Sequence, residues 1–350
     1  MRIPLLLLFL GVSAFAADPS PAPVDSLAPG DVSKAIDALK ANFVQPGDLS
    51  DQDLQRATLQ GLLDRLAPEV TLVTGSVSPA GGAPFYAELY QGKTGYLRIA
   101  GLTADNIKRA RQSLDDWTAK SAPAVILDLR ATPATSDYAA GADLARLFCP
   151  KGTELFSLAP GKKSAPAASP EPGAPAAQTF SATDPPAWHG LLVVLVDDQT
   201  SETAETVAAV LQKCAKALLV GSRTAGGAFA YRDYPLGSAT LRVAVARVIL
   251  PDGKEPGEEG LAPDIRADPG SDPVAKLMQS VTEKGVDSVV EEYGFPHLNE
   301  AALVSGSNPE IDEFVAESSG KKPPHIMVDH PLQRALDLVT SISVFQAKKD

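Results

Sequence analysis

The residues whose types and spacing could do chemistry lie near position 200. Ser201, Glu202 and Glu205 follow residues 191–196, a wholly apolar run typical of a strand buried on both faces. A serine hydroxyl becomes a nucleophile when a base lies within hydrogen-bond reach, and two carboxylates could act as a pair. Backbone N–H groups at the start of a helix would stabilise an anion or an oxyanion beside them.

A strand, a tight turn and a helix must position these side chains. Residues 197–201 are polar and indicate the turn, and Thr200 or Ser201 could cap a helix. Apolar residues recur at helical spacing after Glu202, and residues 217–220 predict the next strand. An ordinary βαβ unit with a solvated turn has the same pattern. In that alternative Ser201 is only a helix cap, and Glu202 and Glu205 face solvent.

Composition excludes some classes of function. The chain has 350 residues, of which 44% are hydrophobic, and a net charge of −12. That charge makes nucleic acid an unexpected partner, because phosphate binding needs a positive surface. The four histidines and two cysteines show no metal-ligand spacing, and the sequence predicts neither a metal nor a cofactor. Cys149 and Cys214 form a disulfide or remain free buried thiols, and the sequence leaves both alternatives open.

The N-terminus predicts export. Residues 1–16 have the pattern of a secretory signal peptide, with Arg2, an apolar core at 5–12, and Ala14-Phe15-Ala16 before the cleavage site. The apolar core is too short to span a bilayer, and no later stretch is long and apolar enough to do so. We therefore expect a periplasmic or extracellular protein without a membrane span.

The rest of the chain divides by composition into five predicted segments. They are a flexible leader at 17–30, an N-terminal helical region at 31–72, a short linker at 73–94, a core at 95–268, and a C-terminal helical region at 269–350. Ser50 and Asp53 form a capping-box pattern in the helical region. Within the core, residues 157–187 are rich in proline and alanine, which predicts an exposed, mobile insertion.

Several core motifs resemble those of the tail-specific, or C-terminal processing, serine peptidases. Gly95-Tyr96-Leu97-Arg98-Ile99 is similar to the family's Gly-Tyr-Ile-Arg-Ile, and residues 124–130 are similar to its Leu-Ile-Leu-Asp-Leu-Arg strand. Residues 220–226, Val-Gly-Ser-Arg-Thr-Ala-Gly, resemble its Val-Gly-Glu-x-Thr-Phe-Gly. The resemblance covers about residues 31 to 345. It implies an α/β fold with a ClpP/crotonase-like peptidase core and a serine nucleophile paired with a lysine base.

The catalytic positions of that family hold other residues in this sequence. In the gapless alignment, Glu202 stands at the serine position, Gly227 at the lysine position, and Tyr231 at the polar residue that orients the lysine. Ala134 and Thr135 stand in the loop where the family uses glycines for its oxyanion hole. The family's PDZ domain, which binds the substrate C-terminus, does not fit in the linker at 73–94.

These departures predict a pseudopeptidase of the tail-specific family that binds exported polypeptides or partner proteins. The alternative is an active serine-type endopeptidase with a rearranged site that uses Ser201, which requires a lysine or histidine near Ser201 in the fold. A third hypothesis is a structural subunit whose terminal helices expose an apolar face for assembly. The sequence leaves the oligomeric state open.

Overall fold

The N-terminal unit contains two helices, whereas the last residues of the predicted helical region at 31–72 belong to strand β1 (Val70–Thr74). The computed structural model describes residues 28–42, 50–74, 83–161, 177–256, 259–291 and 327–347, and it separates into units 1–65 and 66–350. The first unit contains α1 (Pro29–Asn42) and α2 (Asp51–Leu66). Ser50 caps α2, because the backbone N–H of Asp53 donates to Ser50 Oγ at 3.2 Å, and the Asp53 carboxylate accepts from the Ser50 hydroxyl. The signal-peptide segment 1–16 lies outside the described residues.

The main sheet of the second unit positions the candidate site. Its strand order is β11-β8-β7-β4-β3-β2. The strands are β2 (Tyr86–Tyr90), β3 (Thr94–Arg98), β4 (Ala124–Asp128), β7 (Leu191–Val196), β8 (Leu218–Gly221) and β11 (Ile265–Arg266). All neighbours are parallel except β2 and β3. Parallel strands covered on both faces need continuous apolar runs, which explains the composition of β4 and β7.

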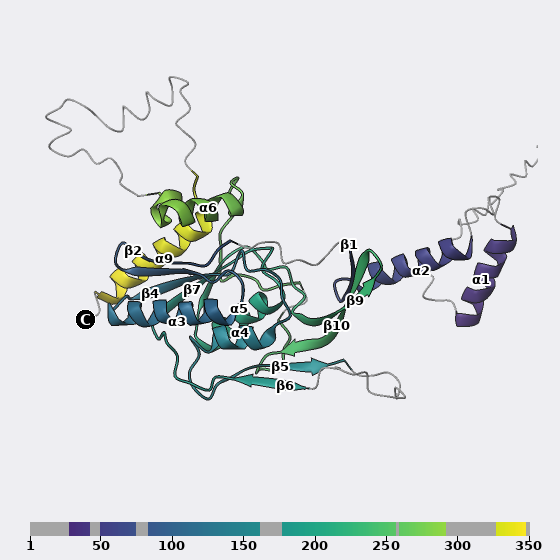
Figure 1. Ribbon diagram of the computed structural model, residues 1–350, viewed down its shortest axis with the longest axis horizontal. Coiled ribbons are helices and arrows are strands. Elements are labelled where there is room, and N and C mark those ends of the chain that lie inside the picture. Colours follow the sequence, from purple (N-terminus) through teal and green to yellow (C-terminus); the bar gives the residue numbers. More distant parts are fainter. Residues whose placement is uncertain are drawn as a thin grey trace, which may run out of the picture. The chain divides into compact units, whose positions relative to one another are not determined.

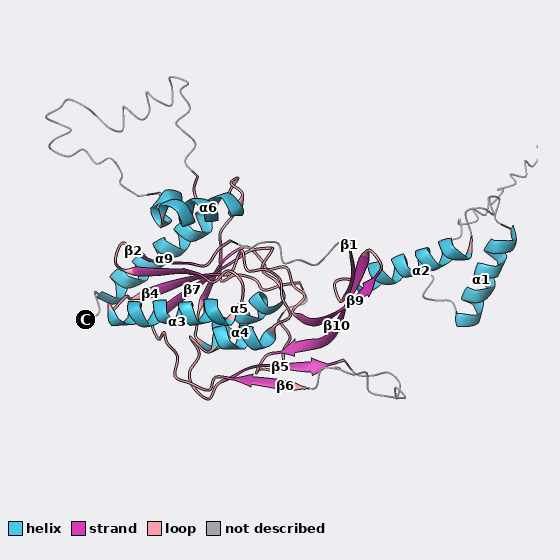
Figure 2. Ribbon diagram, viewed as in Figure 1, coloured by secondary structure: helices cyan, strands magenta, loops and turns pink. Residues whose placement is uncertain are grey.

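Helices cover both faces of this sheet (Figure 2). On one face, α3 (Ala104–Ala119), α4 (Tyr138–Ala145) and α5 (Glu202–Cys214) contribute side chains to one apolar cluster. On the other face, α6 (Val274–Lys284), the 3-10 helix η3 (Val286–Val289) and α9 (His330–Ala347) contribute to a second cluster. This layered arrangement confirms the predicted α/β class.

A second, antiparallel sheet contains β1 (Val70–Thr74), β5 (Glu154–Pro160), β6 (Gln178–Ser181), β9 (Phe229–Leu236) and β10 (Ala239–Ile249). The long strand β10 pairs with β1, β5 and β9 (Figure 1). This sheet brings Arg242 of β10 to the N-terminus of α5.

Two predicted segment boundaries differ from the structure. The linker at 73–94 contains β2, which pairs with the core strand β3, so the core sheet begins earlier than predicted. The insertion at 157–187 is shorter than predicted, because most of β5 and all of β6 lie within it or at its edge. Phe156 and Phe180 stack across this strand pair at 4.7 Å between ring centroids. Because proline and alanine dominate the composition there, the sequence pattern did not indicate these two short strands. Residues 162–176 lie outside the described residues.

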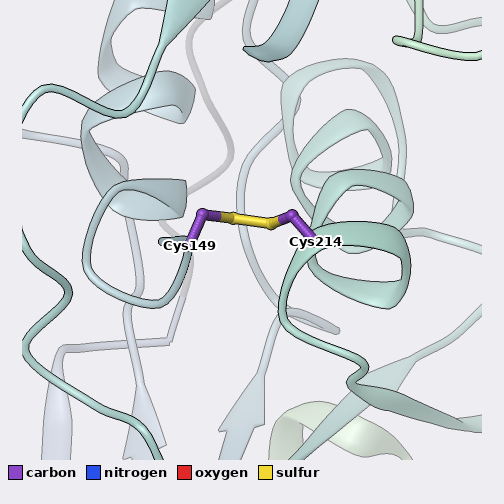
Figure 3. The surroundings of a disulfide bond; sticks show 2 residues. All are labelled: Cys149 and Cys214. Atoms are coloured by element: carbon purple, nitrogen blue, oxygen red, sulfur yellow. A yellow bond between two sulfur atoms is a disulfide. The ribbon is translucent and has the colours of Figure 1, made fainter. Parts of the chain in front are cut away.

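Two long-range connections hold α5 and α9 to the core. A disulfide joins Cys149, shortly after α4, to Cys214, the last residue of α5, with 5.5 Å between the Cα atoms (Figure 3). The guanidinium of Arg130 pairs with Asp128 at 2.7 Å and with Asp329, immediately before α9, at 2.8 Å. All three charged side chains are buried, so each depends on its partners. Asp128 and Arg130 therefore have a structural role.

Candidate functional site

The candidate site begins at the turn between β7 and α5. Asp197 Oδ1 accepts hydrogen bonds from the backbone N–H groups of Gln199 and Thr200 and from the Thr200 hydroxyl. These bonds form an Asx-type turn that ends β7 and starts the helix. Ser201 occupies the N-cap position in an extended conformation, but its side chain makes no capping hydrogen bond. Ser201 is therefore at the predicted N-cap position, but the prediction that its hydroxyl caps the helix is wrong.

Glu202 lies at the predicted serine position and is the first residue of α5. Its φ of +49° is in the left-handed region, which a residue other than glycine seldom adopts. Glu202 is only 6% exposed and Glu205 is fully buried, so the expectation that both face solvent is wrong. The cause is tertiary, because the 131–136 loop and the β9–β10 pair cover the start of α5.

An arginine and a serine hold the Glu202 carboxylate. Arg242 on β10 donates from Nη2 to Oε2 at 3.2 Å, and its Nη1 lies 3.1 Å from Oε1 in the same ion pair. The Ser136 hydroxyl donates to Oε2 at 3.2 Å. Burial raises the pKa of Glu202, and the charge of Arg242 and the bond from Ser136 oppose that rise. The carboxylate is held in place and its charge is compensated by Arg242, which makes it a weaker nucleophile than a free carboxylate.

The other two predicted positions lie beside this ion pair. The Arg242 guanidinium stands 4.7 Å from the centre of the Tyr231 ring, and the Tyr231 backbone N–H donates to Ser136 Oγ at 3.2 Å. A Cβ on Gly227, whose φ is +80°, would lie 3.2 Å from the Tyr231 hydroxyl. Burial, followed by the charge of Glu202, raises the pKa of Tyr231 to about 12, so the phenol stays protonated at neutral pH. The structure thus brings Glu202, Gly227 and Tyr231 together.

Arg242 is the residue that the sequence analysis missed. It lies on a strand of alternating side chains, 40 residues after Glu202, and no local motif marks it. A lone arginine between Leu241 and Val243 was the only available signal. Its pairing with Glu202 depends on how β10 crosses the start of α5, which a strand pattern does not encode.

The loop with Ala134 and Thr135 contacts α5 through a carbonyl. The backbone N–H of Thr203 donates to the Thr135 carbonyl oxygen at 3.3 Å, and the Thr203 hydroxyl donates to the same oxygen. An unbonded N–H in the first turn of a helix is the usual donor to an oxyanion. Here the N–H of Thr203 already has an acceptor from the predicted oxyanion loop.

Glu205 connects α5 to the segment after β8. Its Oε1 accepts from the Thr224 hydroxyl and, at 3.1 Å, from the backbone N–H of Gly226. Its Oε2 is buried and has no hydrogen-bond partner among the described residues. Burial raises the pKa of this carboxyl, while the bonds from Thr224 and Gly226 oppose the rise. Glu205 therefore positions the loop that carries Gly227, and it has no access to solvent.

A cavity of about 740 Å³ lies beside Ser201. The 130–134 loop, the turn at 197–199 and α6 form most of its wall, with Ala83 and Pro84. No lysine or histidine is among the described residues that line it, and Arg130, its one lining cation, is paired with two carboxylates. Within that part of the chain, the base required by the Ser201 alternative is absent from the cavity.

The described histidines lie elsewhere. His189 lines a separate cavity of about 170 Å³ together with Cys214 and Lys216, at the C-terminal end of α5. His330 begins α9, and His297 and His325 lie outside the described residues. The described residues contain no group of three or more histidine, cysteine or acidic side chains that could hold a metal ion. None of the described helices has the length and hydropathy that crossing a bilayer requires.

Comparison with known proteins places this core in a family. A sequence model of peptidase family S41 matches residues 93–267, half of the chain. The carboxyl-terminal-processing protease of Synechocystis is 29% identical over 49% of this chain and 37% of its own length. The carboxy-terminal processing protease CtpA of Bacillus subtilis is 27% identical over 52% of this chain and 37% of its own length. The chain thus aligns with little more than a third of each of these curated relatives.

Solved structures were compared as well. The photosystem II D1 C-terminal processing protease is 24% identical, with a TM-score of 0.42 over 60% of this chain and 52% of that chain. The family match confirms the predicted resemblance and the ClpP/crotonase-like peptidase core. The chain belongs to peptidase family S41.

Proposed function

We propose that this member of the S41 family is an exported protein that binds polypeptides and does not hydrolyse them. The observation that carries the proposal is the ion pair between Glu202 and Arg242 at the nucleophile position. A carboxylate held by a guanidinium and by Ser136 cannot take the place of a serine activated by a lysine. The residue at the lysine position, Gly227, has no side chain to act as a base.

Two further observations support the proposed lack of catalysis. The Thr203 N–H donates to the Thr135 carbonyl oxygen, so an incoming oxyanion would have to displace a bond within the protein. Ser201, the alternative nucleophile, lines a cavity in which the described residues include no lysine or histidine. A hydroxyl without a neighbouring base is a weak nucleophile at neutral pH.

The cavity beside Ser201 supports the binding role. Its volume, about 740 Å³, is in the range that holds a ligand of several residues, and its wall combines apolar side chains with a few polar groups. Export is supported by the signal-peptide pattern of residues 1–16, which predicts ligands among exported polypeptides. We expect the cavity beside Ser201 to hold a segment of such a polypeptide.

The test measures labelling, cleavage and binding on the same preparation. The mature protein is incubated with a fluorophosphonate probe and, separately, with a fluorescent unfolded polypeptide. Cleavage is followed by electrophoresis and binding by fluorescence anisotropy. Ser201→Ala and Ser136→Ala are compared with Ser113→Ala, a control on the outer face of α3. We expect binding without labelling or cleavage in all four proteins.

Three outcomes would overturn the proposal. Labelling and cleavage that vanish in Ser201→Ala would identify an active endopeptidase with a rearranged site. Labelling and cleavage that vanish in Ser136→Ala would assign the nucleophile to Ser136, with Glu202 as its base. A folded protein that neither cleaves nor binds polypeptides would refute the binding role.

A further inference from the structure

The cavity beside Ser201 contains two buried polar groups with free hydrogen-bonding capacity. Asp197 is only 7% exposed, and all three of its hydrogen bonds use Oδ1, so Oδ2 accepts none from the described residues. Thr132 is 5% exposed, and its Oγ1 has no partner among those residues. Both side chains line the cavity. The Thr132 hydroxyl is buried without a partner, which is costly and indicates that a ligand supplies one, and Asp197 Oδ2 offers a charged acceptor in the same cavity.

The charges of the cavity favour a cation. Asp198 and Glu283 also line it and are exposed to solvent. The only cation among the described lining residues, Arg130, has a side chain that is 2% exposed and is neutralised by Asp128 and Asp329. Three carboxylates thus surround the space without a lining cation of their own. An anionic ligand would be repelled there.

The wall opposite the turn is apolar and suits an alkyl chain. Met278, Val274 and Pro133 line the cavity, with Ala131 and Ala134 from the loop. A lysine or arginine side chain buries its methylene groups against such a surface while its charged end reaches polar groups. A small inorganic cation would make no contact with these apolar side chains.

We propose that the cavity binds a lysine or arginine side chain of the bound polypeptide, with its charged end donating to Asp197. Thr132 accepts a second hydrogen bond from the same group, and the apolar wall holds the alkyl stem. The inference rests on the proposed function, since the side chain belongs to the polypeptide held in the cleft. It makes the protein selective for basic segments.

The test uses unstructured peptides that differ at one central residue: lysine, norleucine, N-acetyl-lysine or glutamate. Their affinities are measured by fluorescence anisotropy with the full mature protein. We expect the lysine peptide to bind at least about tenfold more tightly than the norleucine peptide, because norleucine leaves Asp197 without a donor. The acetylated and glutamate peptides should bind no better than norleucine.

Variants assign the preference to the cavity. Asp197→Asn should remove most of the tenfold preference, while Asp115→Asn, an exposed carboxylate on α3, should leave it unchanged. Circular dichroism checks that Asp197→Asn is folded, since its Oδ1 also forms the turn. If that variant does not fold, Asp198→Asn combined with Glu283→Gln should reduce the preference about threefold.

The outcomes separate this inference from the proposed function. Equal affinities for the lysine and norleucine peptides would overturn the inference and leave polypeptide binding intact. If no peptide binds, the proposed function fails. The cavity can then be tested alone by titrating the protein with n-butylammonium and following the NMR signals of the methionine methyl groups. Loss of the Met278 signal shift in Asp197→Asn would support a cation site, and no shift in the wild-type protein would refute it.

Discussion

Glu202 combines a left-handed backbone with a buried carboxylate, and neither is stable without its neighbours. A residue with a Cβ at φ +49° costs on the order of 1 kcal/mol or more. Removing an ionised carboxylate from water costs several kcal/mol unless a cation compensates it. Arg242 and Ser136 supply that compensation in the structure. The ion pair therefore stabilises the buried carboxylate, and its removal should lower the free energy of unfolding.

Replacing Arg242 with methionine should lower the free energy of unfolding by about 3 kcal/mol at neutral pH. The change keeps an alkyl chain against Tyr231 and leaves Glu202 buried without a cation. Urea unfolding followed by circular dichroism measures the loss. The double variant Glu202→Gln with Arg242→Met should regain part of the lost free energy of unfolding. If the loss in the double variant equals the sum of the losses in the two single variants, the pair does not stabilise the fold as proposed.

Glu205 predicts a pH dependence of stability. Burial raises its pKa in the folded state above the ordinary value of 4.5, so between these two values the folded protein binds the proton more strongly than the unfolded chain. Its contribution to stability therefore declines as pH rises from 4.5 through the folded-state pKa. Glu205→Gln does not titrate and lacks this decline.

The measurement compares urea unfolding of wild type and Glu205→Gln between pH 4.5 and about pH 8. The stability of the variant relative to wild type should increase as pH rises. Glu202 and Asp197, whose pKa values burial also raises, are present in both proteins and cancel in the difference. A difference that stays constant or falls with pH would show that Glu205 is not destabilised by burial of its charge.

At the scale of elements, the site depends on how closely β8 approaches β7. The two strands are parallel neighbours, and Val196 pairs with Gly221 where both strands end. The backbone N–H of Ser222 then donates to the Val196 carbonyl oxygen at 3.2 Å. This contact holds the segment that leads to Gly227 beside the start of α5. The close approach requires a residue without a side chain at position 221.

Gly221→Ala should lower the free energy of unfolding by roughly 3 kcal/mol or more. Gly221 has a φ of +133°, and an added Cβ would lie 1.9 Å from the Val196 carbonyl oxygen. Gly237→Ala is the matched control, because Gly237 has a φ of +63° but no atom within 4 Å of the added Cβ. The control should cost about 1 kcal/mol in the same urea titration. Equal losses in the two variants would mean that backbone conformation alone, without the steric contact, decides the effect.

At the scale of the whole molecule, the charge of −12 acts on ligands before contact. A negative protein attracts cationic peptides over about a Debye length, which is ~10 Å at 0.1 M salt. The acidic side chains of the cavity add to this field at short range. In the proposed binding role, charge should increase both the association rate and the affinity of a basic segment.

The association rate of the lysine peptide should fall several-fold when salt rises from about 20 mM to 300 mM. The norleucine peptide, which lacks the central charge, should show a smaller decrease. Stopped-flow anisotropy with the full mature protein gives both rates. Rates that depend equally on salt would show that the central cation contributes nothing to the encounter.

Much of the frame followed from local patterns in the sequence. Continuous apolar runs indicate the buried strands β4 and β7, and apolar residues at helical spacing indicate the helices α3 and α5. These patterns are local, because the residues that form the buried face of each element are close in sequence. The family motifs then indicated how these elements assemble. Short strands such as β6 were missed, since a few residues beside proline-rich sequence carry little periodic signal.

The chemistry of the site was decided by tertiary structure. The sequence alone predicts that Glu202, Gly227 and Tyr231 stand at the family's catalytic positions, because a gapless alignment with the family motifs needs only residue order. It could not place Arg242 against Glu202, bury Glu205, or leave an acceptor of Asp197 free in a cavity. Each of these depends on contacts between residues far apart in the chain, and burial and charge pairing exist only once those residues meet.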